Sequence, residues 1–238
     1  MLQLKFDIKL FALLFLAFVI STILGTISHE YGHYAVAKYL GYSSTISYGY
    51  TNWNDKATDQ FMDSTYSNYS KEIELQLEFP RKKEFDLVAK KQIHNGFWII
   101  LGGPFQTMLT GTLGFLFVLY HRKKIRNENA LSISQWVIVF LCLFWLRQIA
   151  NLVTWVAGYF FKGKFSLGGD EIGLAIHAGL PMGAILSITA CIALGILVFI
   201  IFKILPFNIR LTFILAGFSG GIFGYFFWLF WIGPILLP

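Results

Sequence analysis

Residues 8–33 read IKLFALLFLAFVISTILGTISHEYGH, an apolar run that leads directly into a histidine motif. The apolar part, Ile8 to Ile27, has the length of about 20 residues that an α-helix needs to cross the hydrocarbon core of a bilayer. It is longer than the apolar region of an ordinary signal peptide, and the histidine motif follows it in place of a small-residue cleavage site. The stretch predicts a retained membrane-spanning helix that continues to about Tyr39.

Four more apolar stretches are long enough to span a membrane. They run from Phe97 to Tyr120, from Ile133 to Phe161, from Gly183 to Ile204 and from Leu211 to Leu237. Of the 238 residues, 56% are hydrophobic and 13% are charged, whereas a soluble domain carries about 25% charged residues. We expect an all-α multi-pass membrane protein with about five transmembrane helices, folded as a single domain over residues 1–238 and surrounded by the lipid bilayer.

The formal net charge of +6 does not indicate nucleic-acid binding. The basic residues gather in short clusters beside the apolar stretches, where lysine and arginine serve as interfacial anchors and topology signals. We therefore expect no nucleic-acid partner. Basic residues near the span ends are balanced between the two sides, so the orientation in the membrane stays open.

The polar segment at residues 42–93 separates the first two spans and predicts an insertion made of a loop and a small β-hairpin. Its first part is rich in serine, threonine, asparagine and aspartate, which is typical of a mobile loop. Glu72 to Phe79 alternates charged and apolar residues, the pattern of a strand with one apolar face. Thr45 to Trp53 is the expected partner strand, and we expect the hairpin to lie on the membrane surface.

Glycines at four-residue spacing mark the last apolar stretch. Gly217 pairs in this way with Gly221, and Gly220 pairs with Gly224. Small residues at this spacing allow helix backbones to approach closely in membranes. We expect these glycines to serve helix packing.

The motif His29-Glu30-Tyr31-Gly32-His33 places two histidines four residues apart. On a helix this spacing puts both imidazoles on one face, one turn apart, where they can share a metal ion. Zinc lowers the pKa of a bound water towards about 7, and the adjacent Glu30 can take a proton from that water. At the end of an apolar run such side chains are costly unless they are buried in the bundle or hydrated. The motif predicts a zinc site with His29 and His33 as ligands and Glu30 as general base.

Two histidines do not complete a catalytic zinc site, which has three protein ligands and an open position for water. His94 and His121 lie beside charged residues at the ends of apolar stretches, and we expect them to be interfacial. Asp170 is better placed, because the glycines that precede it allow the backbone to bend towards the bundle. Glu171 is the neighbouring alternative for the third ligand.

The zinc motif and two later elements resemble the site-2 protease family of intramembrane metalloproteases. Ser28 to Ala37 is similar to the zinc helix of that family, and Gly102-Gly103-Pro104 is similar to its Gly-Pro element. The stretch from Gly169 to Pro181 is similar to the aspartate segment of the family's small bacterial branch. The three elements span residues 28 to 181 and follow one another in the same order as in the family.

This resemblance implies His29, His33 and Asp170 as zinc ligands and Glu30 as general base. It also implies a multi-pass protein of the bacterial cell (inner) membrane. The chain departs from the family at Gln106-Thr107, where many members carry asparagine, and after Asp170, where many carry glycine.

Arg147 stands with Gln148 and Asn151 inside the third apolar stretch. A charged residue at such a position usually faces the bundle interior. Arg147 could stabilise the oxyanion that forms at a scissile carbonyl, as positioned cations do elsewhere. The alternative roles are a structural pairing with Asp170 or Glu171 and snorkelling of the side chain towards a membrane interface.

The expected activity is hydrolysis of peptide bonds in or near the transmembrane segments of membrane-protein substrates. A helical substrate must unwind to be cleaved, and the strand expected at Glu72 to Phe79 would hold the unwound part by strand addition. The alternative is a non-proteolytic membrane binding or regulatory protein that retains the metalloprotease fold, which the departures from the family allow. Substrate identity and oligomeric state stay open.

Overall fold

The computed structural model describes residues 6–127 and 130–238 and is predominantly helical. Within these residues five helices are long and apolar enough to cross a membrane. Their bounds are Ile8–Tyr39, Lys82–Ile125, Ile133–Lys162, Ala184–Ile204 and Phe207–Leu236. The helical nature and the order of the five predicted stretches are confirmed, whereas the crossing of a membrane stays a prediction.

The elements follow one another along the chain with short connections. In order they are α1 (Ile8–Tyr39), β1 (Ser43–Ile46), β2 (Thr51–Asn54), α2 (Lys56–Glu74), α3 (Lys82–Asn127), α4 (Ile133–Cys142), η1 (Leu143–Trp145), α5 (Leu146–Lys162), α6 (Asp170–His177), α7 (Ala184–Phe199), η2 (Ile200–Ile204), η3 (Phe207–Ile209), α8 (Arg210–Phe226), η4 (Phe227–Ile232) and α9 (Gly233–Leu236). Here η1 and η3 are 3₁₀ turns, and η2 and η4 are π-helical ends of longer helices. The third predicted span therefore consists of α4, η1 and α5 in succession.

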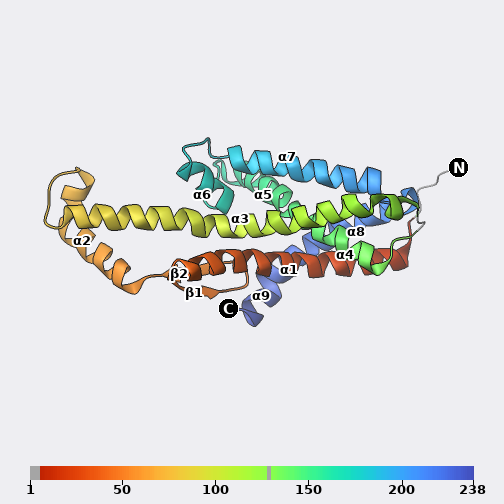
Figure 1. Cartoon of the computed structure of the whole chain (residues 1–238), viewed down its shortest axis with the longest axis horizontal. Coiled ribbons are helices and arrows are strands. Elements are labelled where there is room, and N and C mark those ends of the chain that lie inside the picture. The colour runs from red at the N-terminus through yellow and green to blue at the C-terminus, as the bar shows by residue number, and fades with distance from the viewer. Residues whose placement is uncertain (1–5, 128–129) are drawn as a thin grey trace.

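Helices α1 and α3 lie side by side along the long axis of the bundle (Figure 1). Helix α8 packs on α1, α4 packs on α3, and α7 packs on α5. A cluster of buried apolar side chains fills the end of the bundle at which α1 begins. Phe18 lies in this core, with its ring centroid 4.9 Å from that of Phe140 and 5.3 Å from that of Phe213.

The glycines of α8 form the contact with α1, largely as their spacing predicts. A Cβ added at Gly220 would lie 2.7 Å from the carbonyl oxygen of Phe15, and one added at Gly224 would lie 3.0 Å from Cα of Val19. Gly217 similarly faces the ring of Phe18, whereas Gly221 has no neighbouring atom within 4 Å. Close packing is therefore confirmed for three of the four glycines.

The β-hairpin is confirmed, but its strands differ from the predicted ones. β1 pairs antiparallel with β2, from Ser43 opposite Asn54 to Ile46 opposite Thr51. The predicted partner segment thus folds back on itself, with Ser47 N–H donating to the carbonyl of Tyr50 at 2.9 Å. The turn of the hairpin packs on the C-terminal end of the chain, since Nε1 of Trp228 donates to the carbonyl of Tyr48 at 2.7 Å.

The predicted strand at Glu72 to Phe79 is wrong. Helix α2 runs through Glu74, and the chain then turns at Gln76, which has a positive φ of 56°. The expected partner segment is already paired within the hairpin. Glu72 to Phe79 therefore has no neighbouring strand to pair with, and its alternating pattern is not enough to form a strand. The predicted mobile loop is likewise replaced by the hairpin and by α2, which begins at Lys56.

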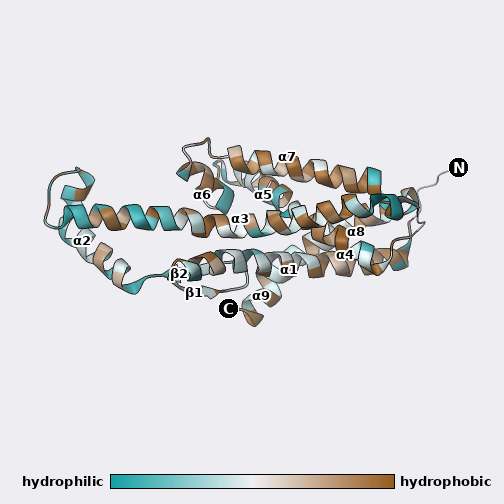
Figure 2. Cartoon of the chain, viewed as in Figure 1, coloured by the Kyte–Doolittle hydropathy of each residue, from teal (hydrophilic) through white to brown (hydrophobic). Residues whose placement is uncertain are grey.

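Helix α2 and the first part of α3 form an arm beyond the apolar bundle (Figure 1). Helix α3 has 46 residues and is about 69 Å long at 1.5 Å per residue. It begins at Lys82, earlier than the predicted span at Phe97, and its first turns alternate between hydrophilic and hydrophobic residues (Figure 2). The insertion at residues 42–93 is therefore a hairpin followed by a helical arm.

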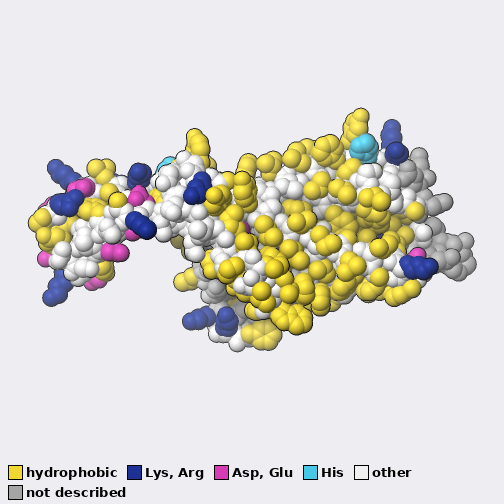
Figure 3. Space-filling model, turned by 90° about the horizontal axis from the view of Figure 1, so that it is seen from below, with side chains coloured by type: hydrophobic (Ala, Val, Ile, Leu, Met, Phe, Trp, Pro, Cys, Tyr) yellow, Lys and Arg dark blue, Asp and Glu magenta, His cyan; other side chains and the backbone are white. Residues whose placement is uncertain are grey.

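The outer surface of the bundle is apolar. In Figure 3, which shows the molecule from below, hydrophobic side chains cover the bundle between its ends, and lysine and arginine lie on the arm and at the two ends. Many large apolar side chains are exposed there, including Leu13 at 67%, Phe218 at 73% and Phe230 at 69%. Such a continuous apolar surface would aggregate in water.

Candidate metal centre

Helix α1 places the zinc motif near its C-terminal end, where it packs against α3. His29, Glu30 and His33 are 0%, 4% and 5% exposed. One possible ligand atom from each of the three lies within 4.8 Å of the others. The four-residue spacing of the histidines on one helix therefore produces the shared face that the sequence predicts.

Asp170, the first residue of α6, brings a carboxylate to the same point. Its Oδ2 lies 2.8 Å from Nε2 of His29 and 3.4 Å from Nε2 of His33. The two Nε2 atoms are 3.2 Å apart. Gly169 has a φ of +120°, a conformation that favours glycine and turns the chain into α6. The three predicted ligands are thus brought together.

Glu171 points away from this cluster. Its two carboxylate oxygens each lie 3.3 Å from Nδ2 of Asn151 on α5. The side chain is buried, and burial raises the pKa of this carboxyl. Of the two candidates for the third ligand, only Asp170 faces the histidines.

The two imidazoles are held by hydrogen bonds at their Nδ1 atoms. Nδ1 of His33 lies 2.7 Å from the carbonyl oxygen of Ile99 and 3.3 Å from the backbone N–H of Gly103. The shorter contact favours the tautomer with the proton on Nδ1, because a carbonyl only accepts. Nε2 of neutral His33 is then an unprotonated lone pair that faces Oδ2 of Asp170. Nδ1 of His29 lies 2.9 Å from the hydroxyl of Thr107, which is 1% exposed. Partners of this kind orient metal-binding histidines and set their tautomer.

The residues at this point fit a divalent cation. Two imidazole nitrogens and one carboxylate oxygen are a common donor set of catalytic zinc and leave a fourth position open. The lone pair of His33 and the Asp170 carboxylate face one another, an arrangement that a cation stabilises. Gly103 on α3 leaves the space, since a Cβ there would collide with Nε2 of His33 and lie 2.6 Å from Nε2 of His29.

Helices α1 and α3 touch through glycines next to these side chains. A Cβ at Gly102 would lie 2.5 Å from the carbonyl oxygen of Gly32, and a Cβ at Gly32 would meet the carbonyl group of Gly102. This contact brings the backbone of α3 close enough for its Ile99 carbonyl and Thr107 hydroxyl to reach the two histidines. The Gly-Pro element therefore acts through its glycines at the site.

Glu30 is positioned by the hairpin. The hydroxyl of Thr51 on β2 lies 3.1 Å from Oε2 of Glu30 and 2.9 Å from its backbone carbonyl. Among the described residues Oε1 of Glu30 has no hydrogen-bond partner, and the carboxylate lies within ligand distance of the two histidines. The sequence assigns no such role to Thr51 or to Thr107, which it marks only as part of a departure from the family pattern, because a lone threonine carries no motif and its partner is distant in the chain.

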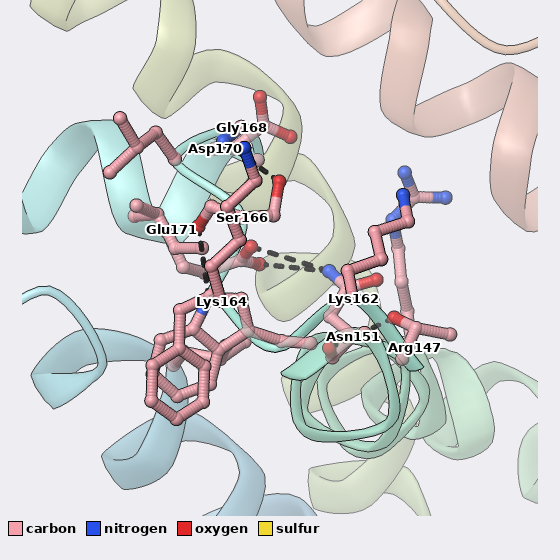
Figure 4. Close-up of a pocket in the computed structure, with 16 residues that line it drawn as sticks. Arg147, Asn151, Lys162, Lys164, Ser166, Gly168, Asp170 and Glu171 are labelled. Atoms are coloured by element: carbon pink, nitrogen blue, oxygen red, sulfur yellow. Dashed lines mark hydrogen bonds between the residues drawn. The ribbon is translucent and has the colours of Figure 1, made fainter. Parts of the chain in front are cut away.

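A cavity of about 790 Å³ adjoins the cluster at Asp170. It lies between α5, the loop at residues 163–169 and α6, and Figure 4 shows the side chains that line it. Arg147 lines this cavity, and within the described residues it makes no ion pair with Asp170 or Glu171 within 4.0 Å. Its Nε is buried without a hydrogen-bond partner. The alternative structural pairing of Arg147 is therefore not formed.

His94 and His121 lie outside the cluster. His94 is exposed and accepts a hydrogen bond from Nε1 of Trp98 at 3.1 Å. The two histidines and Asp170, with Glu30 beside them, therefore form a cluster that could hold a metal ion. No family model, curated protein or solved structure matches the chain.

Proposed function

We propose that this protein is a zinc metalloprotease of the site-2 protease type that hydrolyses peptide bonds in or near transmembrane segments of membrane proteins. The observation that carries the proposal is the convergence of His29, His33 and Asp170 at 2.8–3.4 Å beside buried Glu30. The two histidines lie on α1 and Asp170 lies on α6, and His29 and Asp170 are 141 residues apart in the sequence. Such convergence at one buried point is typical of a metal site.

A zinc ion held by these residues would supply a Lewis acid that activates water near neutral pH and polarises a carbonyl. Glu30 then acts as general base and takes a proton at Oε1, while Thr51 holds Oε2. Arg147 stabilises the oxyanion of the attacked carbonyl from the cavity side, because its Nε has no partner there. Glu30 finally returns the proton to the leaving amine.

Two features of the structure support the proposed membrane location. Five helices have the length and composition to span a bilayer, and the exposed surface between the ends of the bundle is apolar (Figure 3). From Ile8 to Glu30, α1 rises about 33 Å, close to the thickness of a hydrocarbon core. The metal centre therefore lies near one face of the membrane, in a multi-pass integral protein that we assign to the bacterial inner membrane.

The departure at Gln106-Thr107 is compatible with this function. Thr107 supplies the hydrogen bond to His29 that a metal-binding histidine requires. The competing function, a regulatory membrane protein that keeps the fold and the metal, predicts an intact metal centre without cleavage. Strand addition at Glu72 to Phe79 is no longer part of the mechanism, because this segment is a helix end and a turn at the end of the arm.

Replacement of the general base separates the two functions. We expect Glu30→Gln to lower cleavage of a co-expressed membrane substrate at least about 100-fold and to retain zinc, because the three ligands are unchanged. Cleavage is followed by immunoblotting, zinc is measured in the purified protein, and substrates trapped by the variant are identified by mass spectrometry. Undiminished cleavage by a zinc-loaded Glu30→Gln variant would contradict the mechanism.

A further inference from the structure

The cavity beside the metal centre is a groove along one face of α5. Arg147, Asn151, Thr154, Gly158 and Lys162 line it, and their spacing of three or four residues places them on one side of the helix. From Arg147 to Lys162 the helix rises about 22 Å. The groove thus leads from the end of α5 to the point where Asp170 meets the histidines.

Positive charge predominates in this groove. Lys162 and Lys164 line its outer end, and Arg147 lines its inner end. Of its two acidic residues, Asp170 faces the histidines and Glu171 is held by Asn151. The cations therefore have no carboxylate of the groove left to pair with.

Within the described residues none of the three cations forms an ion pair within 4.0 Å. Arg147 also has a buried Nε without a hydrogen-bond partner, and a buried unpaired donor is costly. Figure 4 shows Arg147 and Lys162 extending from the same side of α5. A peptide that supplies carboxylates to the two lysines and a backbone carbonyl to Arg147 would satisfy these groups.

We propose that the groove binds an extended segment of the substrate that carries carboxylates, and that Lys162 and Lys164 select them. This rests on the proposed protease function and names the substrate class. An extended chain covers about 22 Å with six or seven residues. The selected carboxylate, an acidic side chain or a free C-terminus, lies about six residues from the scissile bond.

A lipid phosphate is the other anion that interfacial lysines attract. It would occupy only the outer end of the groove. The unpaired Arg147 lies about 22 Å further in, where a headgroup at the membrane face does not reach. A peptide that runs along the groove to Asp170 would contact the lysines at the outer end and Arg147 at the inner end.

The test measures binding without cleavage. The full chain with Glu30→Gln, loaded with zinc, is placed in nanodiscs of zwitterionic lipid. The probes are dye-labelled peptides with an apolar segment of about 20 residues and a tail of about six residues that contains either glutamates or glutamines. A third probe has the glutamine tail and a free instead of an amidated C-terminus.

We expect the glutamate peptide to bind about tenfold more tightly than the amidated glutamine peptide in fluorescence anisotropy. The preference should decrease at high salt. The free C-terminus probe shows which source of carboxylate the groove prefers. Lys162→Gln with Lys164→Gln should abolish the preference, and Lys162→Glu with Lys164→Glu should reverse it towards a tail of lysines.

A matched control removes the same charge elsewhere. Lys90→Gln with Lys91→Gln changes two exposed lysines of α3 that do not line the groove, so it should retain the preference. Equal affinities of the peptides, or a preference unaffected by the Lys162 and Lys164 changes, would overturn the proposal. So would loss of the preference in nanodiscs that contain anionic lipid, since the groove would then be a lipid site.

The groove and the protease are tested separately. Charge-selective binding without cleavage by the unmodified chain would contradict the protease function alone. Cleavage that is indifferent to the charge of the tail, together with equal binding of the peptides, would contradict the groove alone.

Discussion

The role of Thr107 follows from a contact in the folded protein and not from a sequence motif. Its hydroxyl lies 2.9 Å from Nδ1 of His29 and 3.5 Å from Oε1 of Gln106. The hydroxyl can thus accept from the imidazole while it donates to the amide oxygen, and His29 then turns an unprotonated Nε2 towards Asp170, where the proposed metal would bind. Thr107 is a positioning residue in this arrangement.

Removal of this hydroxyl should weaken metal binding. We expect Thr107→Val to lower zinc affinity about 10- to 100-fold, because the isosteric side chain packs equally well but cannot bind Nδ1 of His29. Competition with a zinc chelator measures the affinity. Thr107→Ser keeps the hydroxyl and should retain most of it, and equal losses in both variants would point to packing as the cause.

The neighbouring acids of α6 allow a second comparison at the residue scale. Asp170→Asn should lose most of the bound zinc, because a neutral amide replaces the charged ligand that faces His29 and His33. Glu171→Gln should retain zinc, since its side chain faces Asn151. Zinc content of the purified variants is the measurement, and zinc retained by Asp170→Asn but lost from Glu171→Gln would reassign the third ligand.

At the scale of elements, the contact between α1 and α3 determines which groups of α3 can reach the two histidines. The two helices meet backbone to backbone at Gly32 and Gly102, which brings the carbonyl of Ile99 to His33 and the hydroxyl of Thr107 to His29. Small residues are the usual means of such approach in membranes. The metal centre is therefore a product of this helix crossing as much as of its ligands.

A methyl group at the crossing should separate the helices. Gly102→Ala places a Cβ 2.5 Å from the carbonyl oxygen of Gly32, and the backbone cannot yield without moving α1. We expect a loss of about 1–3 kcal/mol in stability and weaker zinc binding, measured by thermal unfolding in detergent and by chelator competition. The control is Gly96→Ala on the same helix, where no atom lies within 4 Å; an equal loss there would contradict the crossing as the cause.

At the scale of the whole molecule, the apolar belt separates two polar ends (Figure 3). The arm, the hairpin and the metal centre lie towards one end, and the start of α1 lies at the other (Figure 1). Helix α3 connects the arm with the opposite end of the bundle. If α3 crosses a membrane as proposed, the arm and the end of α3 face opposite sides of it.

Single cysteines can test this topology. In a variant that lacks Cys142 and Cys191, a cysteine at Ser64 in the arm and one at Lys124 near the end of α3 are both at exposed positions. We expect a membrane-impermeant maleimide to label only one of them in sealed vesicles, and both after detergent is added. Labelling of both from the same side of intact vesicles would contradict the proposed crossing of α3.

The sequence alone predicts the features that depend on local patterns. Apolar length identifies the five long helices, and the four-residue spacing of His29 and His33 places both on one helix face. The glycine spacing of α8 likewise predicts close helix packing, although the partner helix, α1, is known only from the structure. These properties follow from helix geometry and from the hydrophobic effect, so they need no knowledge of distant contacts.

Other features are decided only in the tertiary structure. Alternation at Glu72 to Phe79 suggests a strand, but a strand needs a partner, and Thr45 to Trp53 pairs with itself. Asp170 and Glu171 are equivalent as neighbours in the chain, and only the packing of α6 against α3 turns Asp170 towards the histidines. Thr51 and Thr107 reach Glu30 and His29 through contacts between elements. The zinc motif of α1 can therefore be predicted from the sequence. The choice of Asp170 as the proposed third ligand, and the hydrogen bonds that support the site, depend on how α1, α3, α6 and the hairpin pack.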